Sequence, residues 1–258
     1  MDLGLKDKII IVTGGAKGIG AGIVKSLSDE DVFPIIVGRS KADNQALLET
    51  LPRGDHIVAE LSDPAVCEKV IATVLERHGI IDGIVNNAGH NDGIGLEQGS
   101  YEGFIESYHK NVVHYYLLVH FALPALIKSK GSIVNVSSKT AETGQGNTSG
   151  YAAANGARNA LTREWAVELL KYGIRVNALV VAECMTPQYE KWIRTLPDPE
   201  DKLQAIAGNI PLGKRMTTIE EIGDAVTFLL SEKSSHTTGQ LIHVDGGYVH
   251  LDRALANA

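Results

Sequence analysis

Cysteine is scarce in this sequence: only Cys67 and Cys184 occur among 258 residues, and they lie far apart. Neither has the neighbours that would predict a zinc site, and two distant thiols make no disulfide framework. The sequence also holds no metal-site motif, so we predict no metal. This use of cysteine suits a reducing compartment, and we predict a cytoplasmic location.

Long basic runs and long apolar runs are missing as well. The chain has 24 Lys and Arg against 31 Asp and Glu, a net charge of -7, which argues against an extended nucleic-acid-binding face. No uninterrupted apolar run approaches the roughly 18 residues of a membrane span. The N-terminus passes through Lys6, Asp7 and Lys8 instead of a signal-peptide core. We expect no nucleic-acid partner, no membrane and no export.

Short runs rich in Ile and Val recur between longer segments with helical spacing. Continuous apolar strands separated by helices indicate a parallel sheet buried on both faces, with right-handed crossovers. The predicted strands are residues 8–13, 34–37, 56–58, 83–86, 132–136, 175–180 and 240–244. We therefore predict an α/β Rossmann fold, a doubly wound seven-stranded parallel sheet with helices on both faces.

One core can organise a chain of this length, and no linker or repeat divides it. We predict a single domain over residues 1–258. Prolines gather in one otherwise helical stretch, at Pro187, Pro197, Pro199 and Pro211. Residues 187–214 are accordingly predicted to form a lid-like insert over the active site.

The first predicted strand leads into a glycine-rich turn, TGGAKGIG at residues 13–20, and then into helical spacing. Glycines let the backbone approach a pyrophosphate, and the helix N-terminus offers N–H groups and a positive dipole end. A plain glycine turn is the alternative for the motif taken alone. The predicted cofactor-binding residues here are Gly14, Ala16, Lys17, Gly18, Ile19 and Gly20.

The end of the second predicted strand bears on the choice between NAD and NADP. It reads Gly38-Arg39-Ser40, with no carboxylate to accept from a ribose 2′-hydroxyl. Arg39 and Lys17 together favour NADP over NAD, although each alone could be a solvated surface cation.

The remaining motifs follow the order of the short-chain dehydrogenase/reductase family, which the chain resembles over almost its whole length. Asn86-Asn87-Ala88-Gly89 follows the fourth predicted strand, and Ser138 precedes Tyr151 by the family's spacing. The resemblance implies that Asn87, Ala88 and Gly89 approach the adenosine ribose and that Glu60 and Leu61 contact the adenine. It implies further that Asn111 distorts a helix and that Ser138 and Tyr151 meet across the nicotinamide pocket.

The family's chemistry needs one group that moves a proton and one that holds the substrate oxygen. Tyr151 is the candidate proton donor or acceptor, and the hydroxyl of Ser138 can hold the oxygen without changing charge. The predicted catalytic positions are Asn111, Ser138, Tyr151 and Asn155.

Asn155 departs from the family, which has lysine four residues after the tyrosine on the same helix face. Asn155 could still bind the nicotinamide ribose, but it supplies no charge to the phenol of Tyr151. We therefore expect activity that is reduced or shifted to alkaline pH. Arg158 lies seven residues beyond Tyr151 and is expected to reach it poorly; Lys139 is nearer, but should leave the strand end on the opposite side.

The expected substrate side is polar. The proline and glycine common in the family after the sixth strand are Val181 and Ala182 here, followed by Glu183. By resemblance, Thr186 would hold the carboxamide of the nicotinamide, and Glu183 would accept from paired hydroxyls. The predicted substrate-binding residues are His90, Asn91, Asp92, Ser138, Lys139, Glu142, Gln145, Asn147, Tyr151 and Glu183.

Several segments resemble bacterial L-fucose dehydrogenases in particular, namely residues 91–96, 137–141, 143–151 and 250–255. The resemblance implies oxidation of an aldose such as L-fucose at the anomeric carbon to its lactone, with a sugar or polyol as the small-molecule substrate. One alternative is a nucleotide-binding or regulatory homologue whose catalysis Asn155 has impaired. Another is a ketone or acyl-chain reductase, against which the polar loops argue.

Oligomerisation is suggested by the small residues of the predicted helix at 152–170, together with Trp165. The family commonly forms tetramers through this helix, so a homotetramer or homodimer is expected. By resemblance, the tail around His250 and Asp252 reaches a partner subunit.

Overall fold

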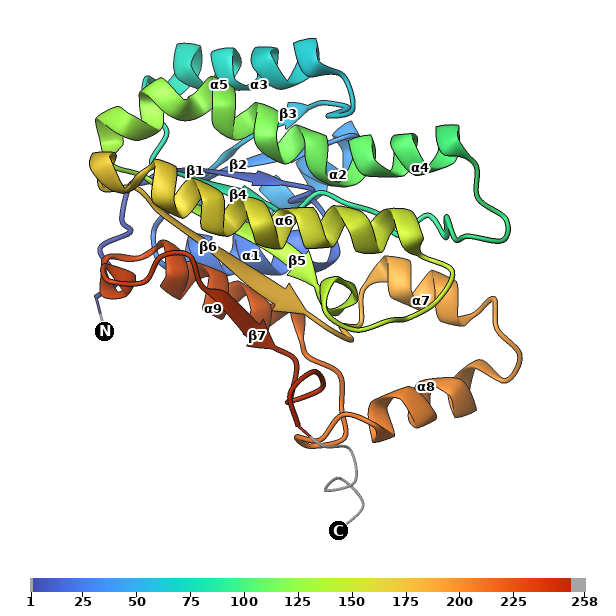
Figure 1. Cartoon of the computed structure of the whole chain (residues 1–258). Helices are drawn as coiled ribbons and strands as arrows, with labels where there is room; N and C mark the ends of the chain where they lie inside the picture. The colour runs from blue at the N-terminus through green and yellow to red at the C-terminus, as the bar shows by residue number, and fades with distance from the viewer. Residues whose placement is uncertain (1, 252–258) are drawn as a thin grey trace.

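The computed structural model describes residues 2–251, and Asp252 lies outside them. Within that range, seven parallel strands form one sheet in the order β3-β2-β1-β4-β5-β6-β7 (Figure 1). The strands are β1 (Ile9–Thr13), β2 (Phe33–Gly38), β3 (Asp55–Val58), β4 (Gly83–Asn86), β5 (Ser132–Ser138), β6 (Arg175–Val181) and β7 (Leu241–Val244). The order reverses between β1 and β4, as in a doubly wound sheet, so the predicted Rossmann fold is confirmed.

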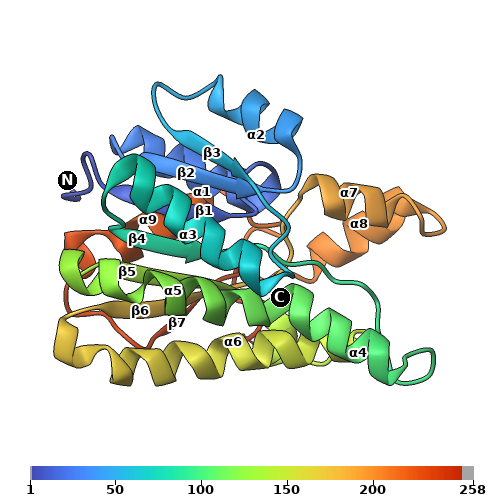
Figure 2. The ribbon, with the colours of Figure 1, turned by 90° about the horizontal axis from the view of Figure 1, so that it is seen from above.

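Helices cover both faces of the sheet (Figures 1 and 2). They are α1 (Gly18–Asp29), α2 (Lys41–Leu48), α3 (Pro64–His78), α4 (Tyr101–Tyr108), α5 (His114–Ser129), α6 (Ser149–Glu168), α7 (Pro187–Ile193), α8 (Pro199–Gly208) and α9 (Ile219–Leu230). Short helices are η1 (His109–Val113), η2 (Lys139–Ala141), η3 (Leu170–Tyr172) and η4 (Glu232–Ser234). The core has two layers, one between the sheet and α3, α5 and α6, the other between the sheet and α1 and α9.

The register of the sheet brings the ends of three strands together. Ser138, the last residue of β5, pairs with Val181 of β6, and Val181 pairs with Val244 of β7. The segments that follow these strands therefore start side by side at the carboxyl ends of the strands. Ligands of open α/β sheets bind at that end of the sheet.

By length and composition alone, one helical stretch of the described chain, Tyr101–Ser129, could cross a membrane, with a mean hydropathy of 1.3 over its most apolar window. In this domain the stretch is α4, η1 and α5, and Tyr115, Leu118 and Leu126 are buried in the core. A core helix passes the same test, so the finding is weak support for a membrane span.

The proline-rich segment forms two short helices, α7 and α8, beyond the carboxyl ends of the strands (Figure 1). Pro187 and Pro199 each occupy the first turn of their helix, where a missing N–H costs nothing. The position agrees with a lid over the edge of the sheet, but its role as a lid stays a prediction.

Candidate active site

The glycine turn lies between β1 and α1, where the sequence predicted it. Gly14 and Gly18 have φ of +62° and +54°, which favours glycine, and a Cβ on Gly20 would lie 2.1 Å from the carbonyl oxygen of Gly14. Helix α1 begins after Lys17 with no side-chain cap and no acidic residue in its first turn. Its first N–H groups are therefore open to an anion, and the turn fits the pyrophosphate of a dinucleotide.

Hydrogen bonds of Asn87 hold the segment after β4 against this turn. Its Nδ2 donates to the carbonyl of Thr13 at 2.9 Å, and the hydroxyl of Thr13 accepts from the N–H groups of Asn87 and Ala88. Asn87 and Ala88, two of the predicted ribose-facing residues, thus lie beside the glycine turn, whereas Gly89 lies against Arg158 and Asn111. Leu61 is buried in the core, while Glu60 is exposed.

The two cations predicted to select NADP each face a carboxylate. Lys17 Nζ lies 2.7 Å from Asp43, and Arg39 lies 3.5 Å from Glu60. Both side chains are largely exposed, so the pairs are weak and open to exchange for a ligand. A 2′-phosphate would have to compete with the carboxylates of Asp43 and Glu60 for these two cations.

Asn111 lies within the π-helix η1, in agreement with the predicted helix distortion. Its Nδ2 donates to the carbonyls of Ser107 and His90, and its Oδ1 accepts from the N–H of His90 at 2.7 Å. Asn111 therefore holds the start of the loop after β4, and Nδ1 of His90 in turn lies 2.7 Å from Nε2 of Gln188 on α7.

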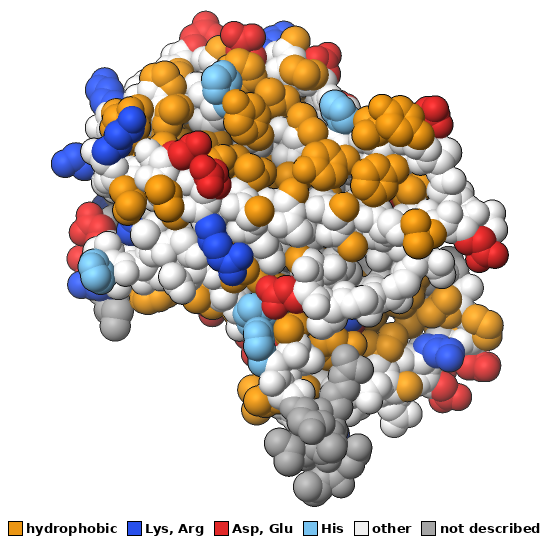
Figure 3. All heavy atoms as spheres, viewed as in Figure 1, with side chains coloured by type: hydrophobic (Ala, Val, Ile, Leu, Met, Phe, Trp, Pro, Cys, Tyr) orange, Lys and Arg blue, Asp and Glu red, His pale blue; other side chains and the backbone are white. Residues whose placement is uncertain are grey.

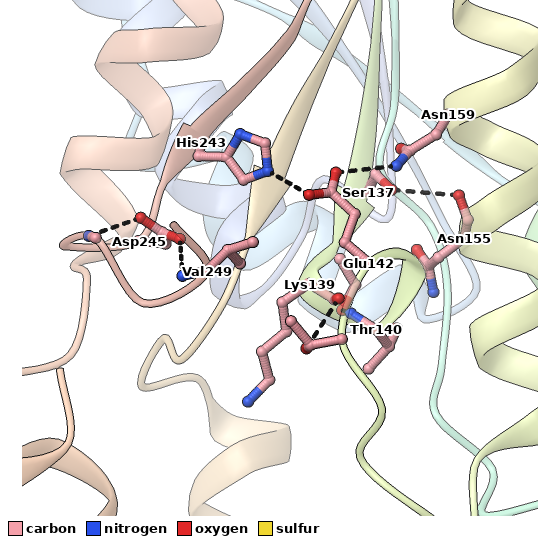
Figure 4. Close-up of polar contacts among 12 residues, drawn as sticks. Ser137, Lys139, Thr140, Glu142, Asn155, Asn159, His243, Asp245 and Val249 are labelled. Atoms are coloured by element: carbon pink, nitrogen blue, oxygen red, sulfur yellow. Dashed lines mark hydrogen bonds and ion pairs between the residues drawn. The ribbon is translucent and has the colours of Figure 1, made fainter. Parts of the chain in front are cut away.

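Hydrogen bonds fix α6 against β5 and so position Tyr151. The hydroxyl of Ser137 donates to the carbonyl of Asn155 (Figure 4), and Asn135 donates to Thr162 at 2.9 Å. Ser138 follows Ser137, and Tyr151 lies one turn before Asn155. Ser138 thus ends β5 and Tyr151 lies in the first turn of α6, and both residues are partly buried.

Arg158 is buried among these residues. Its guanidinium donates to the carbonyls of Asn111 and Val136 and, at 2.9 Å, to Oδ1 of Asn155. Its Cζ lies 6.0 Å from the centroid of the Tyr151 ring. This is nearer than the sequence spacing predicted, because helical side chains point toward the N-terminus of their helix.

No carboxylate compensates this cation: among residues 2–251, none lies within ion-pair distance of Arg158, which is only 2% exposed. The same charge acts on two neighbours on α5. Burial, with Arg158, lowers the pKa of His114 to about 3; burial raises the pKa of Tyr115, against the effect of Arg158.

The segments that follow β5, β6 and β7 meet around a pair of charged side chains, Lys139 and Glu183. The Lys139 ammonium contacts the Glu183 carboxylate, and both residues are 9% exposed. Lys139 Nζ also lies 4.3 Å from the centroid of the Tyr248 ring, a residue that the sequence had not singled out. Burial and the Glu183 carboxylate raise the pKa of Tyr189 on α7. Lys139 therefore points to Glu183 of the segment after β6.

Thr186 caps α7 by accepting from the N–H of Tyr189, and it packs against Gly18 of the glycine turn. It thus lies where α7 meets the cofactor turn, as its predicted role requires.

The remaining predicted substrate residues divide into separate groups. Asp92 accepts a hydrogen bond from the hydroxyl of Ser107, and Asn91 accepts one from the N–H of Gly93 in its own loop. Gln145 and Asn147 are exposed. Glu142 contacts His243 of β7 and accepts from Nδ2 of Asn159 on α6 (Figure 4). Its role in substrate binding stays a prediction.

This arrangement defines a class: a Rossmann-fold protein with a dinucleotide turn and polar groups at the carboxyl edge of its sheet. A family model described as enoyl-(acyl carrier protein) reductase matches residues 14–249. The chain belongs to this family of short-chain dehydrogenases/reductases, whose members are oxidoreductases with a nicotinamide cofactor.

Relatives of this chain include sugar dehydrogenases. An L-fucose dehydrogenase of Bos taurus is 34% identical over 241 residues, covering 93% of this chain and 88% of the relative. The crystal structure of Cj0485 dehydrogenase is 47% identical with a TM-score of 0.95, covering 99% of both chains. Aldohexose dehydrogenase of Thermoplasma acidophilum is 29% identical with a TM-score of 0.89, covering 98% of both. The predicted resemblance to L-fucose dehydrogenases is confirmed. The L-fucose dehydrogenases that match are mammalian, whereas the prediction named bacterial ones.

Proposed function

We propose that this protein oxidises an aldose, L-fucose or a related sugar, at the anomeric carbon, with NADP or NAD as acceptor. The observation that carries the proposal is the buried pair of Lys139 and Glu183, which lie in the segments that follow β5 and β6. Sugar hydroxyls can donate to the carboxylate and accept from the ammonium. An acyl chain would cover this pair without replacing its lost hydration. Relatives that act on sugars support the same conclusion.

The nicotinamide, when bound, accepts the hydride from the anomeric carbon. In the proposed reaction, the hydroxyl of Ser138 donates a hydrogen bond to the anomeric oxygen, and the Tyr151 oxygen takes the hydroxyl proton. The sugar becomes a lactone as its C–H and O–H bonds break and its C=O bond forms. Asn111 contributes by holding the loop that begins at His90.

Arg158 supplies, in this proposal, the positive charge that Asn155 does not. Its guanidinium lies near the ring of Tyr151, and a buried cation favours negative charge on a neighbouring oxygen. Asn155 then acts as a positioning residue, because its Oδ1 accepts from Arg158 and its Nδ2 donates to the carbonyl of Tyr151 at 2.8 Å. This favours a working enzyme over a catalytically impaired homologue.

A panel of sugars tests the proposed reaction. We expect reduction of NADP or NAD with L-fucose or one of its epimers, and a loss of at least about 100-fold in kcat for Tyr151→Phe. Glu183→Gln should raise KM for the sugar more than it lowers kcat, because it weakens hydroxyl binding. Preference for a hydrophobic ketone, unchanged in Glu183→Gln, would contradict the proposal.

Cofactor choice is a separate proposal, in which Arg39 and Lys17 favour NADP. We expect Arg39→Ala to raise KM for NADP by about tenfold and to leave KM for NAD within about twofold. Steady-state kinetics with each cofactor measures this. An equal change for both cofactors, or a native preference for NAD, would count against a 2′-phosphate site here.

Association into a homotetramer or homodimer is also proposed. Apolar side chains are exposed along the face that carries α4, α5 and α6 (Figure 3). They include Tyr101, Phe104, Ile105, Tyr116 and Val167. An exposed apolar surface on neighbouring helices supports a subunit contact there.

A further inference from the structure

We propose that Glu142, His243 and His250 form a binding site for a divalent transition metal such as Zn²⁺, outside the catalytic group. One ligand atom from each of the three residues lies within 4.8 Å of the other two. Nε2 of His243 is 3.0 Å from a carboxylate oxygen of Glu142, and the two imidazoles meet edge to face with centroids 4.4 Å apart. A small adjustment of side chains would bring all three atoms onto one ion.

The three residues come from separate segments that the fold brings together. Glu142 follows η2 and His243 is in β7 (Figure 4), while His250 lies at the end of the turn that follows β7. Glu142 lies 101 residues before His243, which explains why spacing alone led us to predict no metal.

Asn159 gives an independent sign of a missing ligand. It is 6% exposed, and its Nδ2 donates to Glu142, which orients the carboxylate as neighbours of metal ligands commonly do. Its Oδ1 is buried and lacks a hydrogen-bond partner. A water bound to the metal would satisfy this acceptor, since buried polar atoms are rarely left unpaired.

A cavity lies beside the site and leaves room for a water on the metal. Its volume is about 610 Å³, and its lining includes Glu142, Asn159, Arg163, His243 and His250. Three protein ligands with an open fourth position are a common zinc arrangement. Two imidazoles and one carboxylate favour Zn²⁺, Co²⁺ or Ni²⁺ over Mg²⁺ and Ca²⁺, which prefer oxygen ligands.

The position of the site indicates what a bound metal would do. His243 and His250 flank the turn that carries Tyr248, and Asp245 holds this turn by accepting from the N–H groups of Gly247 and Val249. The Lys139 ammonium lies over the ring of Tyr248. A metal that binds both histidines and Glu142 would therefore hold the turn against η2. It would stabilise the contacts among Lys139, Glu183 and Tyr248 without taking part in the reaction.

Metal titration of the full-length, tag-free protein tests the site without using any substrate. We expect one Zn²⁺ per chain by calorimetry, a Co²⁺ complex with visible absorption, and a higher melting temperature with Zn²⁺. His250→Asn and Glu142→Gln should each weaken Zn²⁺ binding by about 10-fold to 100-fold. His236→Asn, which changes an exposed histidine elsewhere, should bind like the native protein.

Native secondary structure by circular dichroism would show that the variants fold. Equal Zn²⁺ affinity and stoichiometry in the native protein and His250→Asn would overturn the proposal. So would a native protein that binds no Zn²⁺. Because binding is read without turnover, either result leaves the proposed sugar oxidation to be decided separately.

Discussion

Arg158 is a buried cation whose hydrogen bonds all go to uncharged oxygen atoms. A guanidinium without a carboxylate is costly to bury, and its hydrogen bonds to the carbonyls of Asn111, Val136 and Ala88 offset only part of that cost. In the proposed function, the guanidinium 6.0 Å from the centroid of the Tyr151 ring supplies the positive charge beside the reacting groups. The departure at Asn155 is coupled to Arg158, whose guanidinium donates to Oδ1 of Asn155.

His114 links this buried charge to the stability of the fold. Its folded pKa of about 3 lies below the ordinary value of 6.5, so the unfolded chain binds a proton that the folded chain does not. Stability is full above about pH 6.5 and is lost as pH falls toward 3, by at most about 1.4 kcal/mol per pH unit. Urea unfolding at several pH values measures this slope. His114→Gln should flatten it, and an unchanged slope would show that other groups cause it.

Element by element, periodicity predicted the sheet well. Strands β1 to β7 lie within a few residues of their predicted ranges, because apolar runs buried on both faces leave a clear signal. The glycine turn and the position of Asn111 were also predictable, since a tight turn and a distorted helix demand particular residues. The contacts of Lys139, Glu142 and Tyr248 were not, because they depend on how three loops pack after neighbouring strands.

Helix α7 is joined to the loop after β4 by Gln188 and His90. If α7 and α8 form a lid, this contact holds it closed. Gln188→Ala should then raise KM for the sugar by a fewfold while kcat changes less, since the exposed contact is worth about 1 kcal/mol. Glu190→Ala on the solvent side of α7 is a matched control. Equal kinetics in Gln188→Ala and the native protein would argue against a closing role.

At the scale of the whole molecule, different strands carry different functional residues at their carboxyl ends. The glycine turn after β1 suits the dinucleotide, the ends of β5 and β6 carry Ser138 and the charged pair, and β7 carries His243. In the proposed function, such a division lets the loops set the substrate while the sheet holds the proposed catalytic groups in place. The predicted oligomer would add partners to the exposed face of α4 and α5.

The central claim is that a sugar dehydrogenase works here with Arg158 in place of a lysine at position 155. Initial rates with L-fucose and its epimers, from about pH 7 to about pH 10.5, test it in the native protein, Arg158→Met, Asn155→Lys and the double variant. We predict turnover by the native protein, a loss of at least about 100-fold near neutral pH in Arg158→Met with its rate rising only at alkaline pH, and recovery in the double variant. Asn155→Lys alone should not help, because it adds a second buried cation beside the first. Native rates and an unchanged pH profile in Arg158→Met would contradict the account, as would activity that appears only after lysine is restored.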